Sequence, residues 1–198
     1  NTLKYVKATL ASNFGNFYAV AVASLILDYL PMLPIQILLC NLLSDFPMIS
    51  IATDTVDDIE VMKPKNYDVR DIALFATILG ITSTVFDFIV FALFRRFEPD
   101  VLQTNWFITS VLTELLFLFL VRTRLPFFKA KRPSWLVLIL TGLAALITIA
   151  TPYTTFGHDV FKFISPTNVH LTLIGIVLVT YIVVTEFVKH YYYKFHRK

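Results

Sequence analysis

Six long apolar stretches dominate the pattern of hydrophobic and polar positions along the chain. A helix needs about 20 mostly apolar residues to cross the hydrocarbon core of a bilayer, and polar connectors separate stretches of about this length. The pattern predicts an all-α, polytopic membrane helix bundle in which residues 1–198 form one transmembrane domain. The expected spans are residues 10–30, 33–53, 72–93, 106–121, 135–153 and 170–188.

The composition excludes a soluble globular domain. Hydrophobic residues make up 57% of the chain and charged residues 16%, whereas a soluble domain has roughly 45–50% and about 25%. The first residue is Asn, and no signal-peptide pattern follows it, so we expect a fragment of a longer chain. The single cysteine, Cys40, has no partner for an internal disulfide.

The basic residues indicate the orientation of the bundle. Lys and Arg accumulate on the cytoplasmic side of membrane proteins, and 14 of the 17 fall at the N-terminus, in connectors 54–71 and 122–132, and in the tail. Both termini are therefore predicted to be cytoplasmic. The net charge of +3 then reflects topology, and no nucleic-acid partner is expected.

Connector 54–71 is also rich in acidic residues. It is either a solvated loop or a docking surface for a soluble domain, and charge patterning alone favours the solvated loop. Its acidic residues are Asp54, Asp57, Asp58, Glu60, Asp68 and Asp71.

The second span contains polar residues at a depth where they are costly. Asn41, Ser44 and Asp45 share one helical face, and Pro47 removes a backbone donor close by. We expect a helix interrupted near mid-membrane, with free carbonyl oxygens beside an amide, a hydroxyl and a carboxylate. Hard cations such as Mg2+ and Ca2+ prefer such oxygen ligands. The alternative is that Asp45 is hydrogen-bonded between helices.

The first span adds two amides, Asn13 and Asn16, one turn apart. Small residues recur every four positions from Ala11 to Ala23, a pattern that lets neighbouring backbones approach closely. This predicts a central, tightly packed helix. Its two amides are either cation ligands or hydrogen-bonding partners for a neighbouring helix.

Three further acidic residues lie within the predicted spans. Asp87 and Glu114 could complete a cation site, and Glu114 could also relay protons; either could instead bond to a neighbouring helix. Glu186 lies within a turn of Lys189, and we expect an ion pair at the surface. No phosphate-binding loop, metalloprotease motif or Ser-His-Asp arrangement is present, so energy for uphill transport would come from elsewhere.

At these residues the chain closely resembles the carboxy-terminal membrane half of the cation-transporting P-type ATPases. Within that superfamily it is most similar to the bacterial magnesium-transporting branch. The resemblance covers essentially the whole chain and implies that the six spans are the fifth to tenth helices of such a pump. It is strongest at residues 1–7 (NTLKYVK), 12–16 (SNFGN), 30–36 (LPMLPIQ) and 41–45 (NLLSD).

The resemblance implies a set of ligands for the transported cation. Asn13 and Asn16 match ion-facing positions of the fifth helix, while Asn41, Ser44 and Asp45 match the unwound ligand segment of the sixth. The calcium pumps have Glu where this chain has Asn16 and Thr where it has Ser44. One carboxylate fewer suits a single divalent ion that keeps part of its water, so Mg2+ is favoured over Ca2+. Glu114 and, less directly, Asp87 would complete the set because of their own positions in the spans, not because of the resemblance.

The resemblance also implies partners. Besides the lipid bilayer, these are the missing N-terminal helices and cytoplasmic domains of the same pump, contacted through loop 54–71. ATP and its Mg2+ would bind only in those missing domains, so this fragment is not expected to hydrolyse ATP or to pump by itself. The alternative is a non-catalytic membrane protein, such as a passive cation channel or a scaffold subunit.

Overall fold

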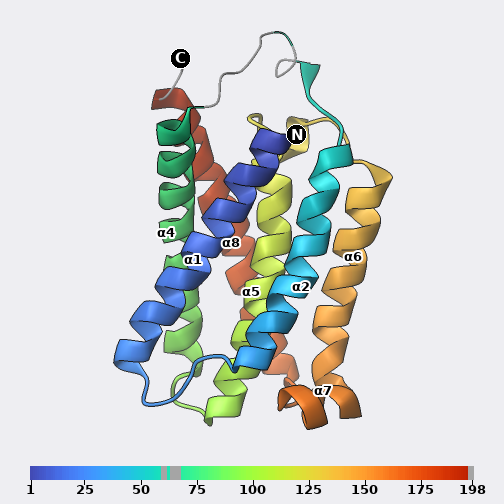
Figure 1. Ribbon diagram of the computed structural model, residues 1–198. Helices are drawn as coiled ribbons and strands as arrows, with labels where there is room; N and C mark the ends of the chain where they lie inside the picture. Colours follow the sequence, from blue (N-terminus) through green and yellow to red (C-terminus); the bar gives the residue numbers. More distant parts are fainter. Residues whose placement is uncertain (59–61, 63–67, 196–198) are drawn as a thin grey trace.

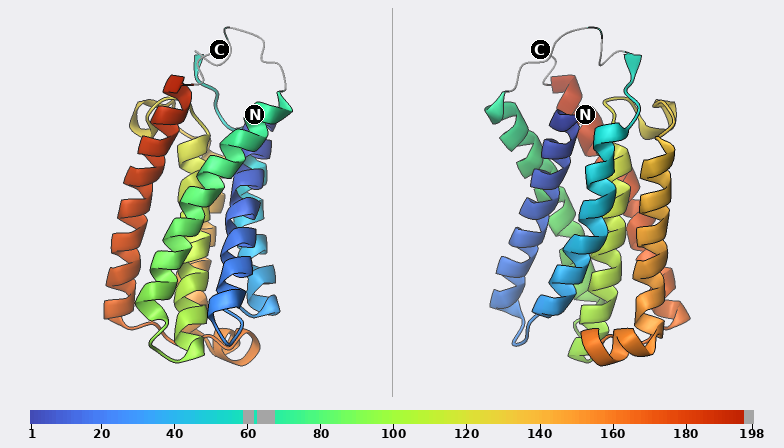
Figure 2. Two further views of the ribbon diagram at one scale, coloured as in Figure 1. Left: turned by 90° about the vertical axis from the view of Figure 1, so that its left-hand side faces the viewer. Right: turned by 45° about the vertical axis from the view of Figure 1, so that its right-hand side comes forward.

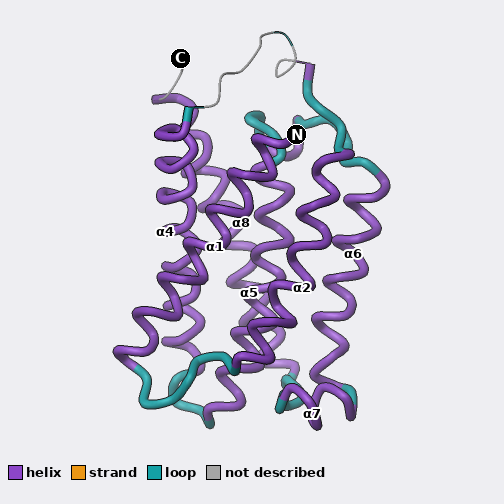
Figure 3. The backbone as a smooth tube through the Cα atoms, in the orientation of Figure 1, coloured by secondary structure: helices purple, strands orange, loops and turns teal. Residues whose placement is uncertain are grey.

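The computed structural model describes residues 1–58, 62 and 68–195, and these residues form a bundle of helices without a strand (Figures 1 and 3). Six helices are long and apolar enough to cross a membrane, which confirms the all-α, six-span prediction. The chain is a multi-pass membrane protein. The elements are α1 (Thr2–Ile26), α2 (Pro34–Ser50), η1 (Ile51–Thr53), α4 (Val69–Phe94), α5 (Pro99–Val121), η2 (Phe127–Lys129), α6 (Trp135–Ala150), η3 (Thr151–Tyr153), α7 (Thr155–Phe161) and α8 (Asn168–Phe195).

Local sequence signals place the helix ends. Pro34 and Pro99 begin α2 and α5, since proline at the first helical position loses no hydrogen bond. The side chain of Ser134 accepts a hydrogen bond from the N–H of Val137 and caps α6. α1 ends at Ile26, four residues before the predicted limit of the first span. The start of α1 and the end of α8 lie at the same end of the bundle (Figure 1), as six spans require.

α5 is the central helix. It contacts all five other long helices, and both views in Figure 2 show it surrounded by them. The prediction that the first span is central is therefore wrong for the described structure. α1 buries one stripe and exposes residues such as Phe17 and Leu25 on its other face, because it packs mainly against one neighbour.

That neighbour is α4, and the predicted close packing of small residues is confirmed. Ala11, Gly15 and Ala19 are buried against α4. A Cβ atom added at Gly80 would lie 3.1 Å from the carbonyl oxygen of Ala11 and 3.3 Å from the backbone nitrogen of Gly15. The hydroxyl of Thr84 donates a hydrogen bond to the carbonyl of Gly15 across this crossing. The two backbones can approach this closely because Gly15 and Gly80 have no side chain where the helices cross.

α2 is continuous from Pro34 to Ser50 and passes through Asp45 and Pro47. The expected interruption near mid-membrane, and with it the unwound ligand segment, is wrong in the described structure. A single proline removes only one helical hydrogen bond, and neighbouring side chains and helices can satisfy the freed group. Within α2, Ser44 and Ser50 donate their hydroxyl protons to backbone carbonyls of the same helix.

The loops after η1 and after α5 are joined by buried polar contacts. Nε of Arg122 lies 2.6 Å from Oδ2 of Asp54, and Thr123 donates to the carboxylate of Asp57. The backbone N–H of Lys131 donates to the same carboxylate at 2.8 Å. Burial raises the pKa of Asp57, but these hydrogen bonds outweigh it, so its pKa lies below the ordinary value.

α8 contacts the end of α5 and the loop that follows it through Lys189. Lys189 is 1% exposed, and its Nζ donates to the carbonyls of Leu120 and Leu125 and to Glu186, at 2.8–2.9 Å. The predicted ion pair with Glu186 is present, but the expectation that it lies at the surface is wrong. A cation is favoured at the C-terminus of a helix, and Lys189 occupies that position at the end of α5.

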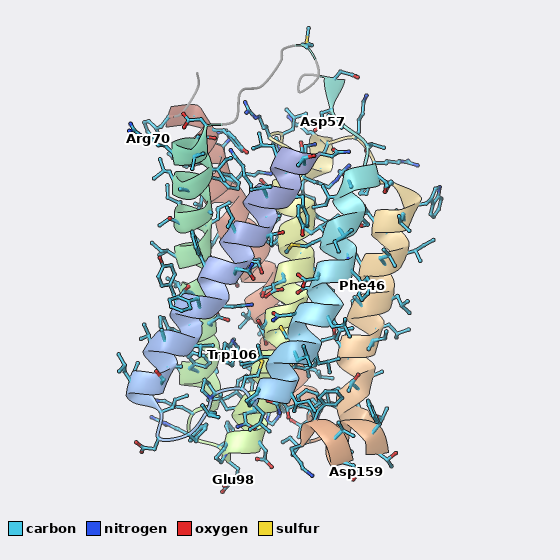
Figure 4. The ribbon with its side chains drawn as sticks, in the orientation of Figure 1. Phe46, Asp57, Arg70, Glu98, Trp106 and Asp159 are labelled. Carbon is cyan, nitrogen blue, oxygen red and sulfur yellow. The ribbon has the colours of Figure 1, made fainter. Side chains whose placement is uncertain are left out.

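The opposite end is closed by the segment that follows α6. The side chain of Gln36, on α2, donates to the carbonyl of Phe161, and the hydroxyl of Thr104, on α5, accepts from the N–H of Ile164. Figure 4 places Asp159 of this segment at the end opposite to Asp57. The segment therefore fixes α2 and α5 relative to one another below the polar residues of the spans.

Replacing Gly80 with Leu should destabilise the bundle, because the added side chain has no space at the α1–α4 crossing. Overpacking of this kind costs about 1–3 kcal/mol, which thermal unfolding of the purified protein in detergent would detect as a lower melting temperature. Gly142→Leu is the matched control, since nothing lies within 4 Å of a Cβ at Gly142. Equal melting temperatures for the two variants would contradict the close crossing.

Candidate cation site

Glu114 on α5 is the centre of a polar cluster inside the bundle. It is 6% exposed, and its Oε1 accepts a hydrogen bond of 2.6 Å from Nδ2 of Asn16, on α1. The side chains of Ser12 and Ser44 also lie near this carboxylate. Three helices, α1, α2 and α5, thus direct polar groups toward one carboxyl group.

The close α1–α4 crossing places Asn16 in this cluster. Asn16 follows Gly15, where α1 lies against α4, and its side chain turns toward α5. The carbonyl oxygen of the same amide accepts a hydrogen bond of 3.5 Å from Ser110. Asn13, one turn earlier, is exposed. The structure therefore brings one of the two predicted amides of α1 into contact with Glu114 and leaves the other on the outer face.

The predicted polar residues of α2 are also partly buried in the cluster and partly exposed. Ser44 is 3% exposed and faces α5, whereas Asn41 and Asp45 are exposed. The carboxylates of Asp45 and Glu114 are close enough to interact electrostatically. Ser44 and Asp45 thus lie near Glu114, but of the three predicted α2 residues only Ser44 is buried.

Asp87 on α4 is separate from this cluster. It is 5% exposed, and its Oδ1 accepts a hydrogen bond of 2.8 Å from the indole nitrogen of Trp106 on α5. Its Oδ2 has no hydrogen-bond partner in the described part of the chain. Figure 4 shows Trp106 within the lower half of the bundle. Asp87 therefore bonds to a neighbouring helix, which was the alternative expected from the sequence to a role as cation ligand.

Several polar residues of the cluster were not predicted as site residues. Ser12 and Ser110 have hydroxyls near Asn16 or Glu114, and the thiol of Cys40 lies 3.9 Å from the Ser110 hydroxyl. A signal for Ser110 was present in the sequence, because it precedes Glu114 by four residues and so lies on the same helical face. The same spacing places Ser12 on the helical face of Asn16, and Cys40 on that of Ser44.

The chemistry of the cluster is that of oxygen ligands. It offers two carboxylates, carboxamide oxygens and hydroxyls, which suit hard divalent cations such as Mg2+ and Ca2+. Among the described residues, no group of three or more His, Cys, Asp or Glu is placed to hold a metal ion. A cation here would therefore depend on neutral oxygens in addition to Glu114 and Asp45.

Comparisons with known proteins agree with this chemistry. Residues 29–191 match the family described as "Cation transporting ATPase, C-terminus". The chain is 34% identical over 199 residues to a protein named "Magnesium-transporting ATPase, P-type 1" from Escherichia coli K12, and 34% identical over 200 residues to a protein of the same name from Salmonella typhimurium. Each alignment covers 97% of this chain but 22% of the relative.

Replacing Trp106 with Phe should destabilise the bundle by about 1–3 kcal/mol, the usual cost of leaving a buried polar group unpaired, because it removes the hydrogen bond to Oδ1 of Asp87. Thermal unfolding of the purified variant measures the effect. Trp135→Phe, at a side chain that is 79% exposed, is the control. Similar losses in the two variants would show that the indole hydrogen bond is unimportant.

Proposed function

Because the chain belongs to the cation-transporting ATPase family, whose C-terminal region it matches, we propose that it forms the transport domain of an ATP-driven cation pump. In this role it supplies part of the binding site for one divalent cation, Mg2+ in preference to Ca2+. The chain spans about a fifth of the length of its curated relatives. ATP hydrolysis is therefore assigned to other parts of such a pump.

The hydrogen bond between Asn16 and Glu114 is the observation on which the proposal depends. It joins a buried carboxylate on α5 to an amide on α1, and Ser44 of α2 lies beside the same carboxylate. An ionisable group inside a membrane span is costly and usually belongs to a path for ions or substrate. When a cation binds, these oxygens can replace part of its water shell.

The exposed residues beside the cluster support the expectation that further helices of the same pump cover it. Asn13, Asn41 and Asp45 point away from the described bundle within the spans, and a carboxylate facing lipid would cost several kcal/mol (about 2.5–3.5 on insertion scales). A neighbouring helix that closes this face would both satisfy Asp45 and complete the cation's ligands. We therefore assign six residues to the site: Asn13, Asn16, Asn41, Ser44, Asp45 and Glu114. Asp87 is assigned as an additional, less direct ligand.

Two arguments favour Mg2+. The relatives with 34% identity are named as magnesium-transporting, and a site with two carboxylates and several neutral oxygens suits a single divalent ion. Mg2+ gives up its water reluctantly and usually keeps several water molecules when bound. Neutral amides and hydroxyls can bond to those waters without adding further charge to the span.

The test is cation-stimulated ATP hydrolysis by the full-length protein, purified and reconstituted in lipid vesicles. Asp45→Asn and Glu114→Gln should each raise the Mg2+ concentration for half-maximal stimulation at least about tenfold, since an interaction with a charged group contributes about 1.5–3 kcal/mol. Asp100→Asn, in the first turn of α5, should leave it unchanged.

Wild-type affinity in both site variants would contradict the ligand assignment. A wild-type protein that Ca2+ stimulates and Mg2+ does not would contradict the choice of ion. Cation flux through vesicles without ATP, and no stimulated hydrolysis, would instead support a passive channel.

Loop 54–71 is assigned as the contact with the cytoplasmic domains of the pump. Asp54 and Asp57 are buried in contacts with the 122–134 segment, so this part of the loop has a fixed position. Asp58 has a side chain that is 84% exposed, and Met62 is 79% exposed. Glu60, Lys63 and Lys65 lie outside the described residues. The fixed start of the loop, followed by the exposed side chains of Asp58 and Met62, suits a docking surface better than a solvated connector.

Reversing the charge at this rim should weaken the link between hydrolysis and transport. In the reconstituted full-length protein, Asp58→Lys is expected to lower the amount of Mg2+ transported per ATP hydrolysed. Asp159→Lys, an exposed position at the other end of the bundle, should leave this ratio unchanged. An unaltered ratio for Asp58→Lys would contradict the assignment of this loop as a docking surface.

A further inference from the structure

Lys7 on α1 is a buried cation at the end of the bundle that holds both chain ends (Figure 1). It is 5% exposed, and its Nζ lies 2.7 Å from Oδ2 of Asp71, in the first turn of α4. The other oxygen of this carboxylate, Oδ1, accepts a hydrogen bond of 2.5 Å from the hydroxyl of Tyr192 on α8. One carboxylate therefore joins three helices, with a separate oxygen for each partner. We call Lys7, Asp71 and Tyr192 the α1 clamp.

Two aromatic rings fix the geometry of the α1 clamp. Nζ of Lys7 lies 4.7 Å from the centre of the Phe75 ring and 6.0 Å from that of the Tyr192 ring. The two rings meet edge to face at 5.1 Å. An aromatic face attracts an ammonium group, but a buried ammonium group also needs an anionic partner. Because the rings and Asp71 together satisfy Lys7, this ion pair is held in one place, unlike an exposed pair that contributes little.

Lys7 and Asn16 lie at the two edges of the buried stripe of α1. They are nine residues apart, which is about two and a half helical turns, so their side chains leave α1 on opposite sides. The small residues that contact α4 lie between them. The close crossing at Gly15 is about 12 Å from Lys7 along the helix axis, at 1.5 Å per residue. A helix held at one crossing can still tilt or rotate there, and a second, directional contact at this distance opposes both movements.

We propose that the α1 clamp positions Asn16 for cation binding. By opposing tilt and rotation of α1, it keeps Nδ2 of Asn16 against the carboxylate of Glu114. The three clamp residues are positioning residues, because they act on the cation through Asn16. The inference rests on the proposed function, since it concerns affinity at the same cation site. When the clamp is broken, Asn16 is beside Glu114 for a smaller fraction of the time, and the cation is bound less tightly.

The first experiment measures Mg2+-stimulated ATP hydrolysis by the full-length protein in lipid vesicles. Lys7→Met removes the charge but keeps an unbranched side chain between the rings, and Asp71 can stay hydrated because its side chain is 38% exposed. The variant should raise the Mg2+ concentration for half-maximal stimulation about three- to tenfold, the effect of losing one neutral hydrogen bond at the site. The maximal rate and the KM for ATP should keep their wild-type values.

Tyr192→Phe removes a single hydroxyl and tests the same clamp with a smaller change, so it decides the question if Lys7→Met does not fold. It should raise the half-maximal Mg2+ concentration in the same direction. Lys194→Met and Tyr191→Phe are the matched controls, because both residues are exposed on α8 and Nζ of Lys194 lies 5.9 Å from the Tyr191 ring. Both controls should have wild-type Mg2+ affinity.

A double-variant comparison distinguishes positioning from general stabilisation. If Lys7 acts through Asn16, then Lys7→Met should lower Mg2+ affinity in the wild type and have almost no further effect when Asn16→Ala is already present. The same factor in both backgrounds overturns the inference, because Lys7 would then act independently of Asn16. Wild-type affinity in both Lys7→Met and Tyr192→Phe overturns it as well, as does a lower maximal rate without a change in affinity.

A structural measurement separates this inference from the proposed function. Maps of the full-length protein by electron cryomicroscopy, without added cation, should show Asn16 bonded to Glu114 in the wild type and beyond hydrogen-bonding distance in Lys7→Met. An unchanged contact in Lys7→Met overturns the inference even if Mg2+ stimulates hydrolysis. Absence of any cation stimulation in the wild type contradicts the proposed function, while the maps still decide whether the clamp positions Asn16.

Discussion

The burial of the Glu114 carboxylate is the constraint on which the arrangement of the bundle depends. A carboxyl group inside an apolar bundle is tolerated only with polar partners, and α5 is surrounded by all the other long helices. The partner from α1, Asn16, donates to Glu114 at 2.6 Å. That contact needs α1 to lie at a fixed rotation and depth beside α5. The small-residue crossing with α4, at Gly15 and Gly80, holds α1 in that position.

The two ends of the bundle keep the helices of the cluster in register. At one end, Lys189 bonds to the carbonyl of Leu120 near the end of α5, while Arg122 and Asp54 join the loop after α5 to the loop after α2. At the other end, Gln36 and Thr104 bond to the segment that follows α6. α2 and α5 are thus tied together above and below the polar cluster. A shift of either helix would therefore move both the cluster and the loop proposed to meet the cytoplasmic domains.

Much of the fold could be predicted from hydrophobic length alone, because a helix inside a bilayer must satisfy its own backbone. This is why six spans and an all-α bundle followed from the apolar stretches. Site residues were harder to predict, because periodicity gives the face of a helix but not the identity of its neighbour. Asn16, Ser44 and Glu114 were identified and lie together. Ser12 and Ser110 were missed, although each precedes one of these residues by four positions, because serine is common in spans and does not by itself mark a site. The interruption expected at Pro47 was wrong because one lost hydrogen bond is a small cost within a packed helix.

The sequence by itself determined the membrane class, the number of spans and the residues whose polarity is costly at that depth, since all three depend on composition along a single segment. Only the tertiary structure decided which polar groups meet. It made α5 the central helix, paired Asp87 with Trp106, buried Lys189 and joined Lys7 to Asp71. Those outcomes depend on the rotation of each helix against its neighbours, and packing between segments far apart in the chain sets that rotation.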